Sequence, residues 1–420
     1  MVTVESDIAN RGLAERGRQR TDWAERQMPV VRGIRERFAR ERPLGGLRLA
    51  VGLHITPETA VLLRTLRAGG AEVALCGSNP LSTRDEVCAT LVAHEGIAVY
   101  ARYREDLATY YRHVEQVLGH GPHLTMDDGA DLIVALHERP ALLGGMLGGL
   151  EETTTGVLRV RAMARQGALR FPVVAVNDTP TKRFFDNRYG TGQNTVDGLL
   201  RATHVLLAGR VAVVAGYGWV GRGVALRLRG MGANVIVTEV SPIAALEALM
   251  EGYRVLPMAA AAAEADVIVT TTGGVEILGR EHFPSLKEGA ILCNSGHFDV
   301  EIDVKALREA AVACHTVRDN VEEYRLPTGQ RVYLVAEGRL VGQAVAEASP
   351  PSVMDLSFAA QALATEWLAQ RRGALAPVVH DIPAEIDERI ARLKLAALGV
   401  RIDTLSPRQV EYSEVWKEGT

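Results

Sequence analysis

Cysteine is scarce in this sequence. Only four of the 420 residues are cysteines, Cys76, Cys88, Cys293 and Cys314, and no two of them form a C-x-x-C pair. Disulfide-rich scaffolds and structural zinc sites need paired or clustered cysteines, so the sequence favours a reduced, cytoplasmic protein that has neither. The histidines likewise show no H-E-x-x-H spacing, and we therefore expect no catalytic metal.

Long apolar runs and an excess of one charge are also missing. No stretch reaches the roughly 20 apolar residues of a membrane span, and none suits a signal peptide. The formal net charge is only −4, which gives no reason to expect a nucleic-acid partner. The arginine-rich N-terminal region carries interleaved acids, unlike an organelle transit peptide: Glu5, Asp7, Glu15, Asp22 and Glu25. We therefore expect neither membrane nor nucleic acid as a partner.

The most informative stretch runs from residue 208 to residue 240. A short apolar run at residues 211–215 predicts a parallel strand buried on both faces. Three glycines follow at once in G-x-G-x-x-G order: Gly216, Gly218 and Gly221. In that order the glycines allow a tight turn, a close approach of the backbone to a pyrophosphate, and close packing of the next helix. That helix, near residues 220–229, would present its N-terminal N–H groups to the phosphates, so the stretch predicts a dinucleotide site.

An acid at the end of the next strand favours one dinucleotide over the other. Residues 234–238 are typical of a second strand, and Glu239 ends it, about twenty residues beyond the glycines. A carboxylate there accepts hydrogen bonds from both hydroxyls of the adenosine ribose, and no arginine follows directly to hold a 2′-phosphate. The cofactor that the sequence predicts is therefore NAD.

Strands and helices alternate along most of the chain, which predicts an α/β fold with doubly wound parallel sheets. We divide the chain into a substrate-binding domain (residues 1–180), a Rossmann-like NAD-binding domain (181–350), and a return helix with a small helical C-terminal oligomerisation arm (351–420). Ligands of such sheets bind beyond the carboxyl ends of the strands. Three polar residues fall in such places: His54, Asn79 and Asp128.

Several long motifs resemble those of the S-adenosylhomocysteine hydrolase (adenosylhomocysteinase) family, from about Arg48 to the C-terminus. They are GLHITPETAVLL from Gly52, SNPLSTRD from Ser78, MDDGADL from Met126, EETTTGV from Glu151, VNDTPTKRFFDNRYGTGQ from Val176, GYGWVGRG from Gly216, NSGHFDVEID from Asn294 and AEGRLV from Ala336. Trp219 and the end at Thr420 resemble the short archaeal and thermophilic bacterial branch, which lacks the C-terminal Lys/Tyr tail of longer members. The resemblance implies a homotetramer.

The resemblance also implies a reaction on a nucleoside in which bound NAD⁺ is regenerated at every turnover. Oxidation of the 3′-hydroxyl places a ketone beside C4′, which makes the C4′ proton removable. The substituent at C5′ then leaves, water adds to the enone, and the stored hydride reduces the ketone again. S-adenosylhomocysteine would thereby give adenosine and homocysteine, and the NAD can stay tightly bound.

Six catalytic residues are implied by the resemblance. Glu152 would hold the ribose hydroxyls, Lys182 and Asp186 would act on the 3′-hydroxyl and C4′ protons, Asn187 would orient the same groups, and His54 and Asp128 would serve the leaving group at C5′ and the attacking water. A lysine can act as a base only if its neighbours lower its pKa. Structural alternatives are an N-terminal helix acid for Glu152, an exposed i,i+4 ion pair for Lys182 and Asp186, and a structural histidine for His54.

Two sets of binding residues are implied as well. On the substrate side they are Thr56, Glu58, Asn79, His297 and Ser349. On the cofactor side they are Thr153, Thr154, Thr155, Asn187, Gly216, Gly218, Trp219, Val220, Gly221, Glu239, Ser295, Gly296 and His297. The loop at 295–297 would also gate the site.

The sequence departs from the family pattern on one side of the implied pocket. Gly342 replaces an asparagine that contacts the nicotinamide, and Ser349 replaces a histidine that lies against the adenine and the gate. Ser241 and Ala244 also replace an Asp and an Asn near the adenosine of NAD. Two smaller side chains on one wall make room. An alternative is therefore a repurposed member that acts on another nucleoside, such as a 4′,5′-dehydratase that expels water and leaves an unsaturated sugar.

Two further classes compete with these hydrolase-type interpretations. A non-catalytic regulator that binds NAD would not need the implied catalytic residues, which are all present. A plain dehydrogenase would exchange its NADH with solvent and show net cofactor turnover.

Overall fold

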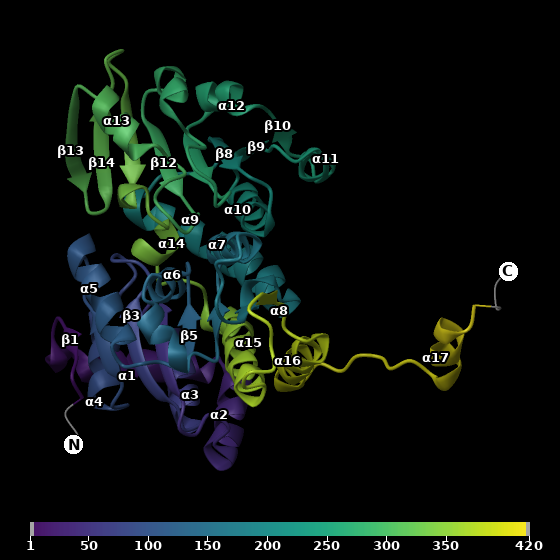
Figure 1. Ribbon diagram of the computed structural model, residues 1–420. Helices are drawn as coiled ribbons and strands as arrows, with labels where there is room; N and C mark the ends of the chain where they lie inside the picture. Colours follow the sequence, from purple (N-terminus) through teal and green to yellow (C-terminus); the bar gives the residue numbers. More distant parts are fainter. Residues whose placement is uncertain (1–3, 417–420) are drawn as a thin grey trace.

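The computed structural model describes residues 4–416 and shows two α/β lobes, each built on an eight-stranded sheet (Figure 1). In spatial order, the strands of the first sheet are β1 (Asp7–Ile8), β4 (Ala98–Ala101), β3 (Glu72–Gly77), β2 (Arg48–Leu53), β5 (Leu124–Asp127), β6 (Gly148–Glu151), β7 (Val173–Ala175) and β16 (Val379–His380). All neighbouring strands pair in parallel. The central strands are buried along almost their whole length, as parallel strands covered on both faces must be.

Helices cover both faces of this first sheet. One face packs against α2 (Pro29–Glu41), α3 (Pro57–Ala68), α4 (Asp85–Ala93) and α15 (Pro351–Gln370). The other face packs against α5 (Leu107–Leu118), α6 (Asp131–His137) and α7 (Thr154–Arg165). The expected start of α3 is confirmed, because Thr56 Oγ1 caps the helix by accepting from Thr59 N and Pro57 occupies the first turn.

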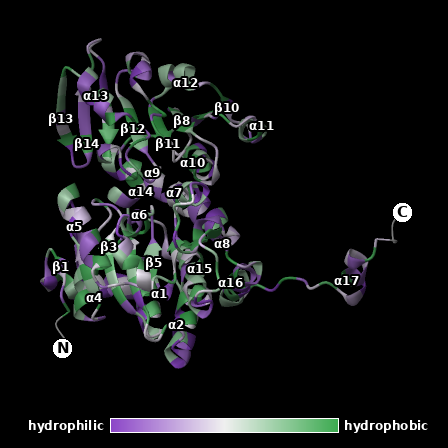
Figure 2. Cartoon of the chain, viewed as in Figure 1, coloured by the Kyte–Doolittle hydropathy of each residue, from purple (hydrophilic) through white to green (hydrophobic). Residues whose placement is uncertain are grey.

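The second sheet carries the glycine-rich unit. In spatial order, its strands are β10 (Arg254–Val255), β9 (Asn234–Thr238), β8 (Val211–Ala215), β11 (Val267–Thr270), β12 (Ala290–Asn294), β15 (Arg331–Val335), β14 (Val321–Arg325) and β13 (Ala313–Arg318). The strands are parallel as far as β15, and β15, β14 and β13 then form an antiparallel meander. The central strands β8, β11 and β12 are strongly apolar (Figure 2).

Five main helices belong to this second lobe: α9 (Thr191–Thr203), α10 (Trp219–Gly230), α11 (Pro242–Met250), α12 (Met258–Glu264) and α13 (Val304–Ala310). The α/β architecture predicted from the sequence, with two Rossmann-like sheets and a helical C-terminal arm, is confirmed. The antiparallel meander at the far edge of the second sheet was not predicted.

The chain crosses between the lobes twice, and both crossings border the site. It leaves the first lobe through α8 (Pro180–Lys182) and a π-helical segment, Arg183–Gly190, which continues into α9. It returns after α14 (Val341–Ala344) through residues 345–350 into α15. The two crossings are packed against each other, because α15 contacts both α8 and the π-helical segment.

The C-terminal segment is only partly a separate arm. After α15, β16 adds a strand to the edge of the first sheet, and α16 (Ala384–Ala397) packs on α15 and α2. Beyond α16 the chain extends away from both lobes and ends its described part in α17 (Pro407–Glu414) (Figure 1). Among the described residues, no helix has the length and apolarity needed to cross a membrane.

Candidate active site

The two lobes enclose a cavity of about 340 Å³ at the carboxyl ends of both sheets. Its lining brings together sequence-predicted residues from both lobes: His54, Thr56, Asp128, Glu152, Thr153, Thr154, Thr155, Lys182, Asp186, Asn187, Gly218, Trp219, Val220, Ser295, Gly296, His297 and Ser349. Residues separated by almost three hundred positions in the chain thus share one enclosed space, as a two-lobed site for a nucleoside and a dinucleotide requires.

Lys182 is the centre of one buried polar group in this cavity. Its Nζ donates to Asn187 Oδ1 at 2.7 Å and lies 3.2 Å from Asp186 Oδ2. Glu152 Oε1 is 3.9 Å away. Lys182 and Asp186 are both buried, so the alternative of an exposed ion pair does not hold. The segment that begins after Lys182 is a π-helix, a kind of helix that is frequent at functional sites. The four-residue spacing still places the Lys182 and Asp186 side chains on the same side of this segment.

The electrostatics of Lys182 differ from the expectation. Burial alone would lower the pKa of Lys182, but the carboxylates of Asp186 and Glu152 outweigh burial and raise the pKa above its usual value. The condition for a lysine base, a pKa lowered by its neighbours, is therefore not met in the protein without its ligands. Lys182 is therefore an ammonium ion in the ligand-free protein, and an ammonium ion can accept a proton only after it has given one away.

Burial has the opposite effect on the pKa of Glu152. Burial raises the pKa of Glu152 to about 8, and the nearby Lys182 only partly offsets this. Its Oε2 accepts a hydrogen bond from Gln361 of α15, whereas Oε1 has no hydrogen-bond partner. A buried carboxyl oxygen without a partner, directed into a cavity, is suited to bind a ligand hydroxyl.

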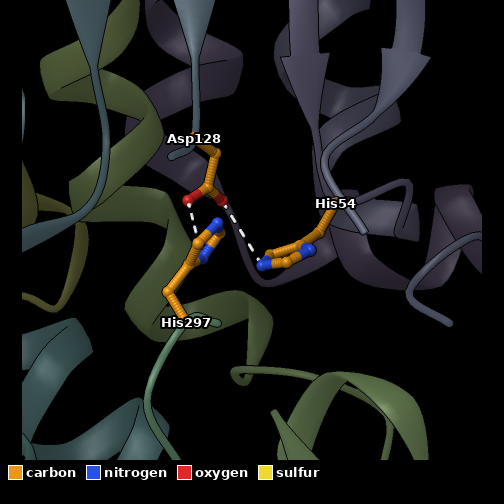
Figure 3. A group of neighbouring side chains, drawn as sticks. All are labelled: His54, Asp128 and His297. Carbon is orange, nitrogen blue, oxygen red and sulfur yellow. Dashed lines mark ion pairs between the residues drawn. The ribbon is translucent and has the colours of Figure 1, made fainter. Parts of the chain in front are cut away.

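A second group, formed by His54, Asp128 and His297, lies in the same cavity (Figure 3). His54 Nε2 is 3.4 Å from Asp128 Oδ2, and His297 Nδ1 is 3.6 Å from Asp128 Oδ1. On its other side, His54 Nδ1 is held by the hydroxyls of Ser82 at 2.7 Å and Ser78 at 3.0 Å. Burial lowers the pKa of His54 to about 4, so this histidine is a neutral imidazole at physiological pH.

The same three side chains are close enough together to bind a metal ion. Each comes from a different loop, so no local spacing such as H-E-x-x-H could have revealed the group. Asp128 Oδ1 and His297 Nδ1, which lie 3.6 Å apart, have no hydrogen-bond partner, so each keeps hydrogen-bonding capacity for a ligand. The absence of a catalytic metal stays a prediction.

The glycine-rich loop fits a bound dinucleotide. Gly216 has φ of +96°, which only glycine adopts easily, and a Cβ at Gly221 would come closer than 3.0 Å to the carbonyl oxygen of Gly216. A Cβ at Gly218, in contrast, would meet nothing within 4 Å, so the backbone there is open to an approaching phosphate. Gly218 also caps the N-terminus of α10, whose first residues, Trp219 and Val220, line the cavity.

Glu239 ends β9 as predicted, close to this loop. Its carboxylate accepts hydrogen bonds from the backbone N–H groups of Tyr217, Val240 and Ser241. The loop turn and the acid are thereby held in fixed relative positions. This arrangement matches the ribose-binding acid of a dinucleotide fold.

Two residues expected on the substrate side, Asn79 and Glu58, do not line this cavity. Asn79 does not line the cavity, and its Oδ1 accepts from Leu81 N within the loop that carries Ser78 and Ser82. Glu58 borders a neighbouring cavity on the far side of Ser349. Thr153 lines the active-site cavity and also caps α7 by accepting from Gly156 N.

Several polar residues that support the site were missed by sequence reasoning. Asn177 Oδ1 accepts from Asn187 Nδ2, and buried Glu301 accepts from the backbone N–H groups of Thr272 and Gly273, which follow β11 and line the cavity. Gln361 lies in the middle of α15, about 200 residues from its partner Glu152. The polar Asn177 after a strand was a usable signal, but nothing local distinguishes Gln361 from any other helical glutamine.

Comparison with known proteins decides the family. Residues 187–348 match the family model "S-adenosyl-L-homocysteine hydrolase, NAD binding domain", and residues 5–143 match the model "S-adenosyl-L-homocysteine hydrolase". The adenosylhomocysteinase of Aquifex aeolicus is 56% identical, covering 99% of this chain and 100% of the relative. Those of Thermosynechococcus vestitus and Saccharolobus solfataricus are 53% and 54% identical, covering 99% and 98% of this chain and 97% and 99% of the relatives.

The chain belongs to the S-adenosyl-L-homocysteine hydrolase family.

The departures from the family pattern look different once the structure is known. A Cβ at Gly342 would come closer than 3.0 Å to Oδ1 of Asn194, a residue of α9 that we had not singled out. The space expected at position 342 is therefore already filled. Ser349 is buried and hydrogen-bonded to both Asn194 and Asp186. The inference that two small side chains leave the pocket wall open is wrong at Gly342.

Proposed function

We propose that the protein is an NAD-dependent adenosylhomocysteinase, an enzyme that converts S-adenosylhomocysteine to adenosine and homocysteine. The observation that carries this proposal is the meeting of two buried groups in one cavity. One group is centred on Lys182 and the other on Asp128, and the glycine-rich loop borders the same space. High identity to adenosylhomocysteinases over the whole chain supports the same activity. No observation on the site favours the dehydratase alternative.

NAD fits this chain through the open backbone at Gly218, the N-terminus of α10 and Glu239. When bound, NAD⁺ supplies the acceptor for the hydride of the 3′ carbon and returns that hydride at the end of the cycle. Among the residues next to the loop, Ser295 is fixed by a 2.6 Å hydrogen bond between its hydroxyl and that of Thr195. The cofactor is regenerated, so the enzyme gains nothing by releasing it.

The Lys182 group handles the sugar. The unpaired Oε1 of Glu152 accepts a hydrogen bond from a ribose hydroxyl. Since Lys182 is charged, it accepts the 3′-hydroxyl proton only as it passes one of its own protons to Asp186, whose Oδ2 is 3.2 Å away. C4′ is the neighbouring sugar carbon, and the pair can accept its proton once the ketone has formed and Asp186 has released the first proton to solvent. Asn187 and Asn177 keep the Nζ in place through a chain of hydrogen bonds.

The Asp128 group handles C5′. Burial disfavours the imidazolium of His54, so the protonated ring readily gives its proton to the sulfur that leaves C5′, and the neutral ring that results accepts the proton of the water that then adds there. Asp128 lies within 3.6 Å of both His54 and His297 and stabilises the imidazolium form of His54. His297 belongs to the second lobe, so the group is complete only when the lobes are together (Figure 3).

A set of product assays tests this function. The wild-type enzyme should release adenosine and homocysteine from S-adenosylhomocysteine, identified by mass, with no net NADH formed. Lys182→Ala should lower kcat about 10²–10⁴-fold, because it removes the proton carrier. Lys305→Ala, at an exposed lysine of the second lobe, is the matched control and should keep full activity. Full turnover of Lys182→Ala, or an unsaturated nucleoside as the only product, would refute the proposal.

We also propose a homotetramer. The extended segment after α16 exposes large apolar side chains, including Ile402, Leu405 and Tyr412, on a chain that leaves the body of the molecule (Figure 1). Such a segment buries its apolar area only against another surface. Sedimentation should give the tetramer mass for the full chain, and a chain that ends before residue 400 should be smaller than a tetramer.

The domain limits and the cellular compartment are proposals as well. We place the limits at residues 180/181 and 350/351, because both lie where the chain crosses between the lobes. Within the C-terminal unit, α15, β16 and α16 extend the first lobe. The four cysteines are free thiols, which supports action in a reducing compartment such as the cytoplasm.

A further inference from the structure

Asn194 and Gly342 fit together as a pair. The Asn194 side chain projects from α9 over the backbone of α14, into the place that a side chain at position 342 would take. Asn194 is buried, so its amide cannot turn outward to water. Any residue other than glycine at 342 would have to displace this amide. The Asn194 side chain can therefore take this position only because residue 342 has no side chain.

The Asn194 amide begins a line of hydrogen bonds that ends at the catalytic pair. Its Nδ2 donates to Ser349 Oγ at 3.2 Å, and Ser349 Oγ donates to Asp186 Oδ1 at 2.9 Å. The other oxygen, Asp186 Oδ2, faces Lys182 Nζ at 3.2 Å and accepts from Ser357 of α15 at 3.4 Å. Both carboxylate oxygens of Asp186 therefore have partners, and these partners hold the side chain in place.

The chemistry of the groups fixes the direction of these bonds. An ionised carboxylate only accepts, so the single hydroxyl proton of Ser349 must go to Asp186. The Ser349 oxygen can then only accept, so the NH₂ end of Asn194 must face it. Asn194 Oδ1 is left facing the backbone of residue 342 with no hydrogen-bond partner. A buried amide oxygen without a hydrogen-bond partner costs free energy. We therefore expect the other end of the amide to have a role that offsets this cost.

We propose that Asn194 and Ser349 are positioning residues that hold the Asp186 carboxylate against Lys182, and that Gly342 permits this by leaving the space that the Asn194 amide fills. The inference rests on the proposed function, because it takes Lys182 and Asp186 as the pair that moves the 3′-hydroxyl proton. Neither Asn194 nor Ser349 needs to touch the reacting atoms. Two of the positions at which this chain departs from the family pattern, Gly342 and Ser349, thus form one unit with Asn194.

Single variants test each member of the line. Asn194→Ala and Ser349→Ala should each lower kcat about tenfold with little change in KM, because one hydrogen bond to the carboxylate or its support is lost. Ser349→Thr keeps the hydroxyl and should restore most of the rate. The first chemical step is read directly as the absorbance of reduced nicotinamide that forms when adenosine is mixed with the NAD-loaded enzyme, and its pH profile should shift in both alanine variants.

The pairing of Asn194 with Gly342 gives the sharper test. Gly342→Ala should slow the enzyme as much as Asn194→Ala does, because the new Cβ displaces the amide. In an Asn194→Ala background, the same Gly342→Ala change should have almost no effect, because the obstacle is gone. The neighbouring Gln193 is exposed, so Gln193→Ala is the matched control for a substitution on the same helix and should keep the wild-type rate.

The outcomes separate this inference from the function on which it rests. If the wild-type enzyme forms no reduced nicotinamide with adenosine, the proposed function fails first. If it does, but Asn194→Ala and Ser349→Ala keep the wild-type rate and pH profile, only the positioning role is refuted. Equal and additive effects of Gly342→Ala in both backgrounds would also overturn it. Should Gly342→Ala not fold, the coupling of Asn194→Ala with Ser349→Ala decides, since two members of one line should not be additive.

Discussion

Gly129 of the first lobe and His297 of the second lie so close together that a Cβ at position 129 would come closer than 3.0 Å to His297 Nε2. Gly129 directly follows Asp128 and has φ of +109°, a backbone conformation that residues other than glycine rarely adopt. The two lobes therefore close the cavity by a contact in which one partner must have no side chain.

Gly129→Ala should separate this contact and lower kcat/KM about 10- to 100-fold, as expected for a strained backbone and a displaced His297. Steady-state kinetics give the loss, and small-angle scattering should show a larger radius of gyration if the lobes open. Gly167→Ala is the matched control, because Gly167 also has a positive φ of +66° but a Cβ there would meet nothing within 4 Å. Equal losses in both variants would attribute the effect to backbone strain alone.

His54→Ala should separate the two halves of the reaction. The variant keeps the Lys182 group, so adenosine should still give the absorbance of reduced nicotinamide in the NAD-loaded enzyme. Hydrolysis of S-adenosylhomocysteine should fall about 10²–10⁴-fold, because the acid–base group at C5′ is gone. Ser82→Ala, which removes only the 2.7 Å partner of His54 Nδ1, should cost about tenfold. Parallel loss of both signals in His54→Ala would contradict this division of labour.

Glu239→Ala should weaken the binding of NAD about 10- to 100-fold, the range for losing charge-assisted hydrogen bonds. The carboxylate is expected to bind the ribose, and it also holds the N–H groups of Tyr217, Val240 and Ser241. Calorimetric titration of the apoenzyme with NAD measures the loss. Glu247→Ala, which removes an exposed partner of Arg222 near the same loop, should leave the affinity unchanged. An unchanged affinity in Glu239→Ala would mean that the acid is only structural.

Sequence reasoning reached the fold and most of the cavity lining because both follow from local patterns. The glycine-rich unit combines strand, turn, helix and acid within about thirty residues, and parallel sheets gather the residues that follow their strands at one edge. Thr56 and Pro57 similarly predict the start of α3. Such signals come from residues that are close together in the chain, so they do not depend on how distant segments pack.

The remainder depends on contacts between segments far apart in the sequence. Asn194 acquires its role from Gly342 and Ser349, and Gln361 from Glu152, each pair being joined only by the packing of the two crossings. The raised pKa of Lys182 is a result of the same kind, because burial and two carboxylates act in opposite directions and only the distances decide which effect wins. The meander β13–β14–β15 was missed because its exposed outer strand carries no clear apolar alternation.

Glu58 should make the stability of the protein depend on pH in a direction opposite to that of most surface acids. It is buried, its Oε2 has no hydrogen-bond partner, and burial raises its pKa to about 7 from the usual 4.5. The folded protein thus binds a proton here more tightly than the unfolded chain does. Stability is fully retained below pH 4.5 and is lost as the pH rises through 7, by roughly 3 kcal/mol from this group.

Glu58→Gln removes this titration and should raise the thermal midpoint by a few degrees at pH 8, where Glu58 is ionised, while leaving it almost unchanged near pH 5. Scanning fluorimetry of the ligand-free protein at the two pH values measures the difference. Glu288→Gln, at an exposed acid paired with Arg331, is the control and should raise the midpoint at neither pH. Because glutamine has nearly the shape of a protonated glutamic acid, a gain of equal size at both pH values would point to packing and would exclude the charge of Glu58 as the cause.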